Sequence, residues 1–231
     1  MNRESTNRVR YVLEELVPPA LRDTWLFRWP IRKFWSTHVD LFADFRERAP
    51  FLTEEEYTRV YRDYPRIHDQ SDNSQACIDR IIKDVVGTSV CDVGCGGGAL
   101  LRLIREKRPD VTAFGGIDVQ LDYIPANQGM DIREGKVESL PFADGSFDTV
   151  ICTHVLEHVL DIRAAVAELR RIARRRVLIV VPRERECRYN FNPHFHFFPY
   201  VHSFLRVMFP IPEHYHVEDI ARDIYYREDR A

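Results

Sequence analysis

The sequence predicts an α/β fold in which a doubly wound, mostly parallel sheet of seven strands follows an α-helical N-terminal extension. Three observations lead to this prediction. Beyond residue 89, short β-branched runs alternate with stretches of helical periodicity, which is typical of repeated βαβ units. A glycine-rich turn follows the first of these runs directly. Near the C-terminus, two short runs joined by a tight connection predict an antiparallel edge for the sheet.

The predicted core spans residues 75–231 and begins with a helix near Gln75. Apolar residues at helical spacing predict two further helices, at residues 99–107 and 162–173. The last two strands are predicted at residues 214–220 and 223–229, with a two-residue turn between them. Five apolar runs supply the parallel strands, at residues 90–93, 111–119, 131–134, 149–153 and 177–181.

Residues 1–74 form the predicted helical extension, which we expect to act as a lid. An apolar helical periodicity over residues 9–17 ends at a proline pair, and Thr53 with Glu56 forms a capping box for a later helix. Residues 21–36 hold all three tryptophans among basic side chains. These rings could dock the extension on the core, cover a substrate pocket or make a weak membrane-surface contact, and the sequence leaves the three interpretations open.

Composition narrows the class of protein. With 231 residues, 45% of them hydrophobic, the chain can bury the core of one ordinary domain plus an elaboration. The formal charge of −3 gives no global attraction for nucleic acid. The arginines between residues 170 and 176 are expected on the solvated face and last turn of a helix.

Without a secretory leader or an apolar span, the protein is expected in the cytoplasm, with its five cysteines reduced.

The glycine-rich turn lies in the stretch SVCDVGCGGGAL, residues 89–100. Gly94, Gly96 and Gly98 give GxGxG, but the same stretch also satisfies the dinucleotide pattern GxGxxA. Asp118 follows about 20 residues later at the end of a predicted strand, where a carboxylate would accept ribose hydroxyls of either cofactor. Glycine spacing therefore does not choose between a nicotinamide dinucleotide and another nucleoside.

Asp92 favours a cationic ligand. It precedes Gly94 by two residues at the carboxyl end of the first strand, so its charge would face whatever the turn holds. A carboxylate there would repel a diphosphate and would suit an ammonium or a sulfonium. The alternative is that Asp92 points away and accepts from backbone amides.

Four segments, the first of which contains the glycine-rich turn, carry a family resemblance. In order they are VCDVGCGGGALL, GGIDV, GKVESLPFADGSFDTVICTHVLEHV, and RAAVAELRRI followed by VLIVVP. Over residues 77–182 the chain resembles class I S-adenosylmethionine-dependent methyltransferases of the UbiE-like (methyltransferase type 11) group. This resemblance implies a Rossmann-like sheet and S-adenosylmethionine as the cofactor.

The resemblance also implies roles for individual residues. Asp92 would lie near the amino group of the cofactor, Asp118 would bind the ribose hydroxyls, and His158 would shape the substrate pocket. The remaining cofactor-binding residues fall at the glycine turn (Gly94, Cys95, Gly96 and Gly98), beside the adenine (Val119, Val137 and Glu138) and by the methionine end (Thr153 and His154).

Lys136 departs from the family pattern, which usually has an acidic residue at this position to accept from the adenine amino group. Because lysine cannot accept a hydrogen bond, adenine recognition would shift to Val137, Glu138 or water, or weaken. The glycine pair that usually precedes the fifth strand is also absent, and the helix runs directly into RRRVLIVV.

His194 and His196 are the candidate catalytic bases, in an aromatic stretch after the fifth strand. If this stretch is extended, alternation places both rings on one face, near the carboxyl ends of the strands. Each imidazole could take a proton from an acceptor hydroxyl. The alternative is that both rings only pack among phenylalanines, and a metal site is not expected because no third ligand is evident.

The sequence thus predicts an enzyme that methylates a small molecule, with an oxygen of a sugar, quinone or phenol as the favoured acceptor. No obligate protein partner and no nucleic acid substrate are expected. Two other functions stay open. The protein could bind S-adenosylmethionine without catalysis, or it could be an NAD(P)-dependent oxidoreductase.

Overall fold

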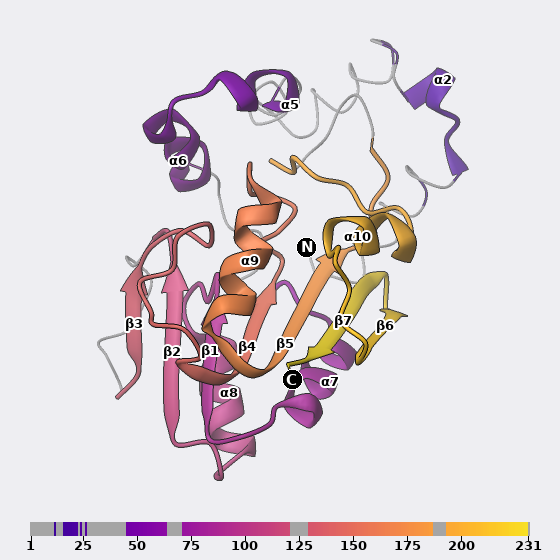
Figure 1. Cartoon of the computed structure of the whole chain (residues 1–231). Helices are drawn as coiled ribbons and strands as arrows, with labels where there is room; N and C mark the ends of the chain where they lie inside the picture. The colour runs from indigo at the N-terminus through magenta and orange to yellow at the C-terminus, as the bar shows by residue number, and fades with distance from the viewer. Residues whose placement is uncertain are drawn as a thin grey trace.

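The computed structural model describes residues 12, 16–22, 24, 26, 45–63, 71–120, 129–186 and 193–230. Within these ranges the strands form one seven-stranded sheet in the order β3-β2-β1-β4-β5-β7-β6 (Figure 1). The first five strands in this order are parallel, and β7 pairs antiparallel with both β5 and β6. The predicted fold class is therefore confirmed, including the antiparallel edge.

The strands and helices of the core lie close to their predicted positions. The strands are β1 (Ser89–Val93), β2 (Ala113–Asp118), β3 (Asp131–Glu134), β4 (Phe147–Thr153), β5 (Ala173–Pro182), β6 (Tyr215–Ile220) and β7 (Asp223–Asp229). The helices are α7 (Gln75–Asp84), α8 (Ala99–Lys107), α9 (Ile162–Ile172) and α10 (Val201–Val207). The sequence did not predict α10, because aromatic residues and histidines obscure its short helical pattern.

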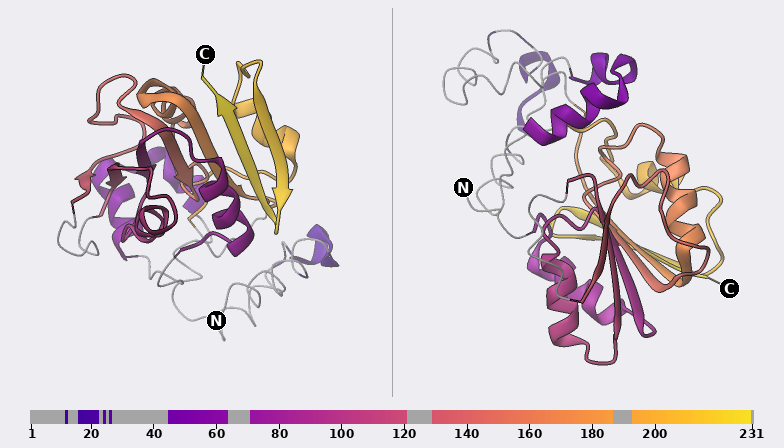
Figure 2. Two further views of the ribbon diagram at one scale, coloured as in Figure 1. Left: turned by 90° about the horizontal axis from the view of Figure 1, so that it is seen from below. Right: turned by 90° about the vertical axis from the view of Figure 1, so that its left-hand side faces the viewer.

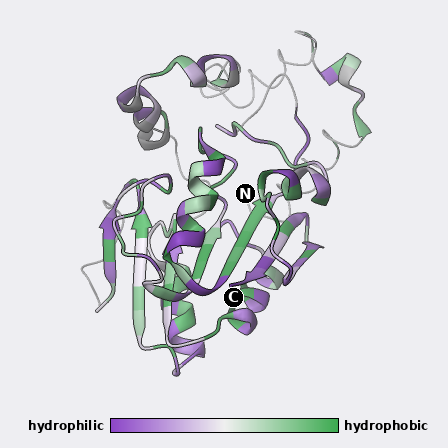
Figure 3. Ribbon diagram, viewed as in Figure 1, coloured by the Kyte–Doolittle hydropathy of each residue, from purple (hydrophilic) through white to green (hydrophobic). Residues whose placement is uncertain are grey.

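Helices cover both faces of the sheet, with α9 and α10 on one side and α7 and α8 on the other (Figures 1 and 2). Side chains alternate along β5, so Val177 and Ile179 join the core under α9 while Leu178 joins the core under α7 and α8. All three are fully buried. This two-sided burial explains why β4 and β5 are hydrophobic toward their carboxyl ends (Figure 3).

The connection between α9 and β5 lacks a turn, as the missing glycines predicted. Asp161 caps α9 by accepting from the Ala164 backbone N–H at 2.9 Å, and the helix ends at Ile172. Residue 173, expected as its last residue, is instead the first of β5. The register of β4 against β5 shifts between Phe147 and Thr149, which is where this direct entry into the strand is accommodated.

The prediction for the arginines between residues 170 and 176 was wrong in part. Only Arg170 and Arg171 lie in α9, and the other three begin β5. Arg170 is not solvated, because its guanidinium makes two hydrogen bonds to the fully buried carboxylate of Glu228 at 2.8 and 2.7 Å. Paired acids thus account for several of these cations without any nucleic acid. Further carboxylate partners are Glu168 and Asp144 for Arg171, Asp148 for Arg174 and Asp229 for Arg176.

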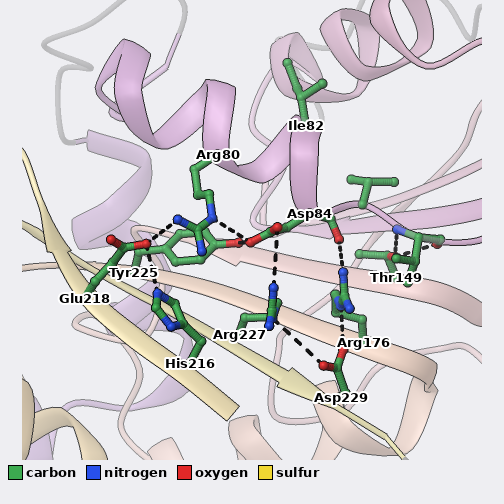
Figure 4. A network of polar contacts seen from close by, with 12 residues as sticks. Arg80, Ile82, Asp84, Thr149, Arg176, His216, Glu218, Tyr225, Arg227 and Asp229 are labelled. Atoms are coloured by element: carbon green, nitrogen blue, oxygen red, sulfur yellow. Dashed lines mark hydrogen bonds and ion pairs between the residues drawn. The ribbon is translucent and has the colours of Figure 1, made fainter. Parts of the chain in front are cut away.

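A polar network joins α7 to the antiparallel edge of the sheet (Figure 4). Asp84, at the end of α7, accepts from Arg80 Nε at 2.7 Å and from the Tyr225 hydroxyl at 2.8 Å, and Arg227 approaches it at 3.5 Å. Arg80 also pairs with Glu218 of β6. The network holds the first helix of the core on strands that come last in the sequence.

The described part of the extension contains α2 (Pro19–Arg22), α5 (Phe45–Arg48), the 3₁₀ helix η2 (Ala49–Phe51) and α6 (Glu54–Asp63). The predicted capping box is present, since Thr53 N donates to Glu56 Oε2 at 2.8 Å and Glu56 N donates to Thr53 Oγ1 at 3.3 Å. α5 and α6 lie beyond the carboxyl ends of the parallel strands (Figures 1 and 2). The three tryptophans, and most of the segments at 9–17 and 21–36, lie outside the described residues.

Two further expectations concern thiols and membranes. Cys77, Cys91, Cys95 and Cys152 are buried and form no disulfide among the described residues, which do not include Cys187. In the part of the chain that the structure describes, no helix has the length and apolar character needed to span a bilayer.

Candidate functional site

The glycine turn is held against the second strand. The backbone N–H groups of Gly94 and Cys95 both donate to the Ile117 carbonyl of β2, at 2.7 and 2.9 Å. Gly94 has a φ of 80°, and a Cβ there would lie 2.1 Å from Val155 Cγ2. Only glycine tolerates both this left-handed conformation and this close approach. Gly98, also at positive φ, precedes the first residue of α8.

Asp118 binds the turn from the end of β2. Gly96 N donates to Asp118 Oδ2 at 2.7 Å, and Gln120 N donates to Oδ1 at 3.0 Å. The side chain of Asp118 is only half-buried, so its oxygens border solvent as well as the turn. Because each carboxylate oxygen accepts more than one hydrogen bond, ribose hydroxyls can still bind here.

Asp92 lies between the turn and the core. It is 2% exposed, and its Oδ1 has no hydrogen-bond partner among the described residues. Burial, and secondarily the charge of Asp118, raises the pKa of Asp92 to about 7. The alternative in which Asp92 caps backbone amides therefore finds no support at Oδ1. An unpartnered buried carboxylate oxygen is a group that a cationic ligand would stabilise.

The other residues predicted to bind the cofactor lie at the same edge of the sheet. Thr153 ends β4 and is 9% exposed, and its hydroxyl accepts from Asn73 Nδ2 at 2.9 Å. His154 follows it with a φ of 55°, a left-handed conformation that non-glycine residues adopt at some cost. Val119 follows β2, while the buried Val137 and the half-buried Glu138 follow β3. Parallel strands bring these positions together because their carboxyl ends share one edge.

Lys136, where the sequence departs from the family pattern, lies in a turn that follows β3. Lys136 forms an isolated bridge with Ser139, whose N–H donates to the Lys136 carbonyl at 3.2 Å. Val137 lies inside this turn and is 5% exposed. A backbone hydrogen bond thus closes the turn that carries Lys136 and Val137.

The two predicted bases do not lie on a strand. Residues 193–198 have no regular secondary structure, so the alternation expected for His194 and His196 is absent. The backbone N–H groups of Phe195 and His196 instead donate to the Glu157 carbonyl, at 2.7 and 2.9 Å. These bonds fix the segment on the LEHV turn that follows β4.

His194 and His196 have different surroundings. His194 is 7% exposed, and its Nδ1 lies 2.6 Å from Oε2 of the buried Glu184. Its ring meets that of His158 edge to face, with centroids 4.7 Å apart. His196 is half-buried, its Nε2 has no partner among the described residues, and burial lowers the pKa of His196.

Glu157 is the residue that the sequence analysis missed at this place. It is 1% exposed and lies beside His158, which the resemblance assigns to the substrate pocket. Burial alone would raise the pKa of Glu157, but the neighbouring imidazoles, His154 first, bring it down to about 2. Burial lowers the pKa of His158 to about 4. The LEHV motif pointed to Glu157, whereas nothing in the charged run after β5 singled out Glu184.

Comparison with known proteins agrees with this geometry. Residues 91–181 match the family model described as "Methyltransferase domain". A ubiquinone biosynthesis O-methyltransferase from Hahella chejuensis is 34% identical over 97 residues, 38% of this chain and 40% of that protein. One from Xanthomonas euvesicatoria is 38% identical over 87 residues, 34% of this chain and 35% of that protein. The matched stretch thus spans about two fifths of the length of these relatives.

Solved structures agree on the fold. A SAM-dependent methyltransferase from Aquifex aeolicus superimposes with a TM-score of 0.52 at 14% identity, covering 77% of this chain and 98% of that one. One from Mesorhizobium loti gives 0.51 at 13% identity, covering 68% and 99%. The strand order is thus that of the fold shared with these solved structures, and residues 91–181 are similar to the family model of a methyltransferase domain.

Proposed function

We propose that this chain is an S-adenosylmethionine-dependent methyltransferase that methylates an oxygen of a small-molecule acceptor. The observation that carries the proposal is the Asp92 carboxylate, which is 2% exposed beside the glycine turn with Oδ1 unpartnered among the described residues. A cofactor bearing an ammonium and a sulfonium would stabilise this charge, whereas a diphosphate would be repelled. The methyltransferase-domain match over residues 91–181 supports the same assignment.

The proposed cofactor contacts follow the carboxyl ends of the first four strands. Asp92 would face the amino group, and the backbone from Gly94 to Gly98 would hold the methionine moiety. Asp118 would accept from the ribose hydroxyls, which is the contact with the clearest expected effect on affinity. When bound, S-adenosylmethionine supplies a methyl group on a positively charged sulfur, which keeps the electron pair as the methyl leaves.

The protein's own part in the reaction is alignment, exclusion of water and acceptance of the hydroxyl proton. His196 is the proposed proton acceptor, because its Nε2 has no partner among the described residues and it lies on the segment fixed to the LEHV turn. His194, the other predicted base, is held by Glu184 at Nδ1 and turns toward His158 and Glu157.

We also propose that the extension covers the acceptor. The Tyr57 hydroxyl of α6 donates to the His158 carbonyl, and Phe195 packs against the apolar cluster that Phe45, Ala49, Leu52 and Val60 form with Tyr57. Both contacts fall on segments that carry the histidines. The extension, residues 1–74, would thus act as the lid, and the core of residues 75–231 would carry the cofactor.

The acceptor class is inferred from the relatives and from the side chains around the site. The relatives named above are O-methyltransferases of ubiquinone biosynthesis by name. An aromatic and histidine-rich surrounding suits quinones, phenols and sugars alike. An oxygen acceptor is favoured because it needs a base, and the imidazoles supply one.

Calorimetry on the purified chain tests cofactor binding. Asp118→Ala should weaken S-adenosylhomocysteine binding about tenfold to a hundredfold, since hydrogen bonds to a charged group are lost. Asp131→Ala, at the amino end of β3, is the matched control and should bind normally. Unchanged affinity in Asp118→Ala would mean that the ribose site is misplaced.

Methyl transfer is tested with cofactor labelled in the methyl group and a panel of phenols, quinols and sugars. His196→Gln should lower turnover while cofactor affinity stays within twofold of the original chain. Cofactor binding without transfer to any acceptor would favour a non-catalytic binding protein. The sequence feature that suggests this alternative is Lys136, which departs from the family pattern. Stabilisation by NAD or NADP, and not by S-adenosylhomocysteine, would favour an oxidoreductase.

A further inference from the structure

Three potential metal ligands converge below the described helices of the extension. Glu157 and His158 come from the LEHV turn after β4, and His194 comes from the irregular segment after β5. Each offers one ligand atom, and these atoms all lie within 4.8 Å of one another. His194 lies outside the region matched by the methyltransferase family model, so the family match does not account for this cluster.

The second ring nitrogen of each histidine is held by an oxygen. His158 Nδ1 lies 3.2 Å from the Pro193 carbonyl, and His194 Nδ1 lies 2.6 Å from Glu184 Oε2. A carbonyl and a carboxylate can only accept a hydrogen bond, so each Nδ1 carries the hydrogen. In a neutral imidazole, Nε2 then carries the lone pair. Histidines that bind metals are oriented in this way, by an oxygen on the nitrogen opposite the ion.

The carboxylate of Glu157 has little to balance its charge. It is 1% exposed, and Oε2 has no hydrogen-bond partner among the described residues. Its ion-pair contacts in the described ranges are both with imidazoles, His154 at 3.6 Å and His158 at 3.8 Å. A buried carboxylate that faces two imidazoles is a donor set that a divalent cation would stabilise.

Two imidazoles and one carboxylate select the class of ion. Calcium and magnesium prefer oxygen ligands, whereas imidazole nitrogen favours divalent transition metals and zinc. Tetrahedral ligands of zinc lie about 3.4 Å apart, so the side chains need to close by up to about 1.4 Å around the ion. Three protein ligands would leave a coordination position open.

We propose that Glu157, His158 and His194 bind one divalent transition ion of the zinc type, with Glu184 positioning His194. The inference that a metal binds here depends only on the geometry of the three side chains. Its use rests on the proposed function: the open position would take an oxygen of the acceptor, and the metal would lower the pKa of that hydroxyl.

Titration of the full-length, untagged chain with metal tests the site. After treatment with a chelator and dialysis, Zn²⁺ should bind at one equivalent per chain. Glu157→Gln and His194→Gln should each lower the affinity at least tenfold. His202→Gln is the matched control, because this exposed histidine stacks on Tyr200 and should leave Zn²⁺ binding unchanged. Absence of stoichiometric binding, or equal binding in His194→Gln, would overturn the proposal.

The cobalt spectrum of the wild-type chain provides a readout that needs no variant at a buried position. Co²⁺ bound by two imidazoles and a carboxylate should give a visible absorption band well above that of aqueous Co²⁺. Glu184→Ala should weaken metal binding about tenfold to a hundredfold, and Glu184→Gln, which keeps an acceptor oxygen, should restore most of it. If the wild-type band is absent, or if Glu184→Ala binds as tightly as wild type, the assignment is wrong.

Measuring S-adenosylhomocysteine binding on the same samples separates the two proposals. Cofactor binding without metal binding would overturn the metal site and leave the proposed function standing. Metal binding without cofactor binding would overturn the proposed function and leave the metal site standing.

Discussion

The environment of Asp92 determines both the exposure and the pKa of its carboxyl group. The sequence places it two residues before Gly94, but only packing removes it from solvent and leaves Oδ1 without a partner among the described residues. Burial first, and the charge of Asp118 second, raise its pKa to about 7. At neutral pH the protein therefore holds a carboxyl group close to its titration point beside the glycine turn.

This pKa predicts how stability depends on pH. The unfolded chain releases the Asp92 proton near pH 4 and the folded chain near pH 7, so the folded state binds more protons between these values. The contribution of Asp92 to stability is complete below pH 4 and is lost as pH rises through 7. Between pH 5 and 8 the chain should lose about 3 kcal/mol relative to Asp92→Asn. Urea unfolding of both proteins over this range measures the difference, and a constant difference would refute the prediction.

At the scale of elements, buried ion pairs determine how α9 packs against the antiparallel edge. The Arg170 side chain is 15% exposed and binds Glu228, which is fully buried in β7 and also accepts from the Tyr226 hydroxyl at 2.8 Å. Arg170 additionally donates to the Met208 carbonyl that follows α10. One guanidinium thus links α9, β7 and the end of α10, which a helical-face argument from sequence did not foresee.

Removing that guanidinium should be costly. Arg170→Met leaves the Glu228 carboxylate buried without a cation, and we expect a loss of about 3–5 kcal/mol in the free energy of unfolding. Arg174→Met is the matched control, because its side chain is 59% exposed and should change stability by less than about 1 kcal/mol. Adding Glu228→Gln to Arg170→Met should recover part of the loss. Equal urea midpoints for the two single variants would show that the pair contributes nothing.

At the scale of the whole molecule, contacts between distant parts of the chain close the fold at the C-terminal strands. Asp84 of α7 accepts from Arg80 and from Tyr225 of β7 and is approached by Arg227 (Figure 4). Burial alone would raise the pKa of Asp84, but the hydrogen bonds from Arg80 and Tyr225 bring it below the ordinary value. The stability that this carboxylate supplies is therefore present above about pH 4 and is lost as pH falls through its lowered pKa.

Asp84→Asn should lower the free energy of unfolding by about 2 kcal/mol at pH 7, because two arginines and a tyrosine lose a charged partner. The difference from wild type should be smaller at pH 3 than at pH 7, because the stability from a carboxylate with a lowered pKa is lost as pH falls below about 4. Asp110→Asn, which removes an exposed partner of Arg108, should cost less than about 1 kcal/mol. Urea unfolding at both pH values checks this, and a pH-independent difference would contradict it.

The sequence by itself determined the order of the strands and of the core helices except α10, the antiparallel edge and the positions of Asp92, Asp118, Thr153 and His154. It could do so because hydrophobic periodicity is local, and because the carboxyl ends of parallel strands share one edge. Only the tertiary structure decided that His194 meets Glu184 and His158, and that Glu157 lies buried between imidazoles. Those residues come from an irregular segment and a turn, where no period relates sequence position to direction, so packing alone brings them together.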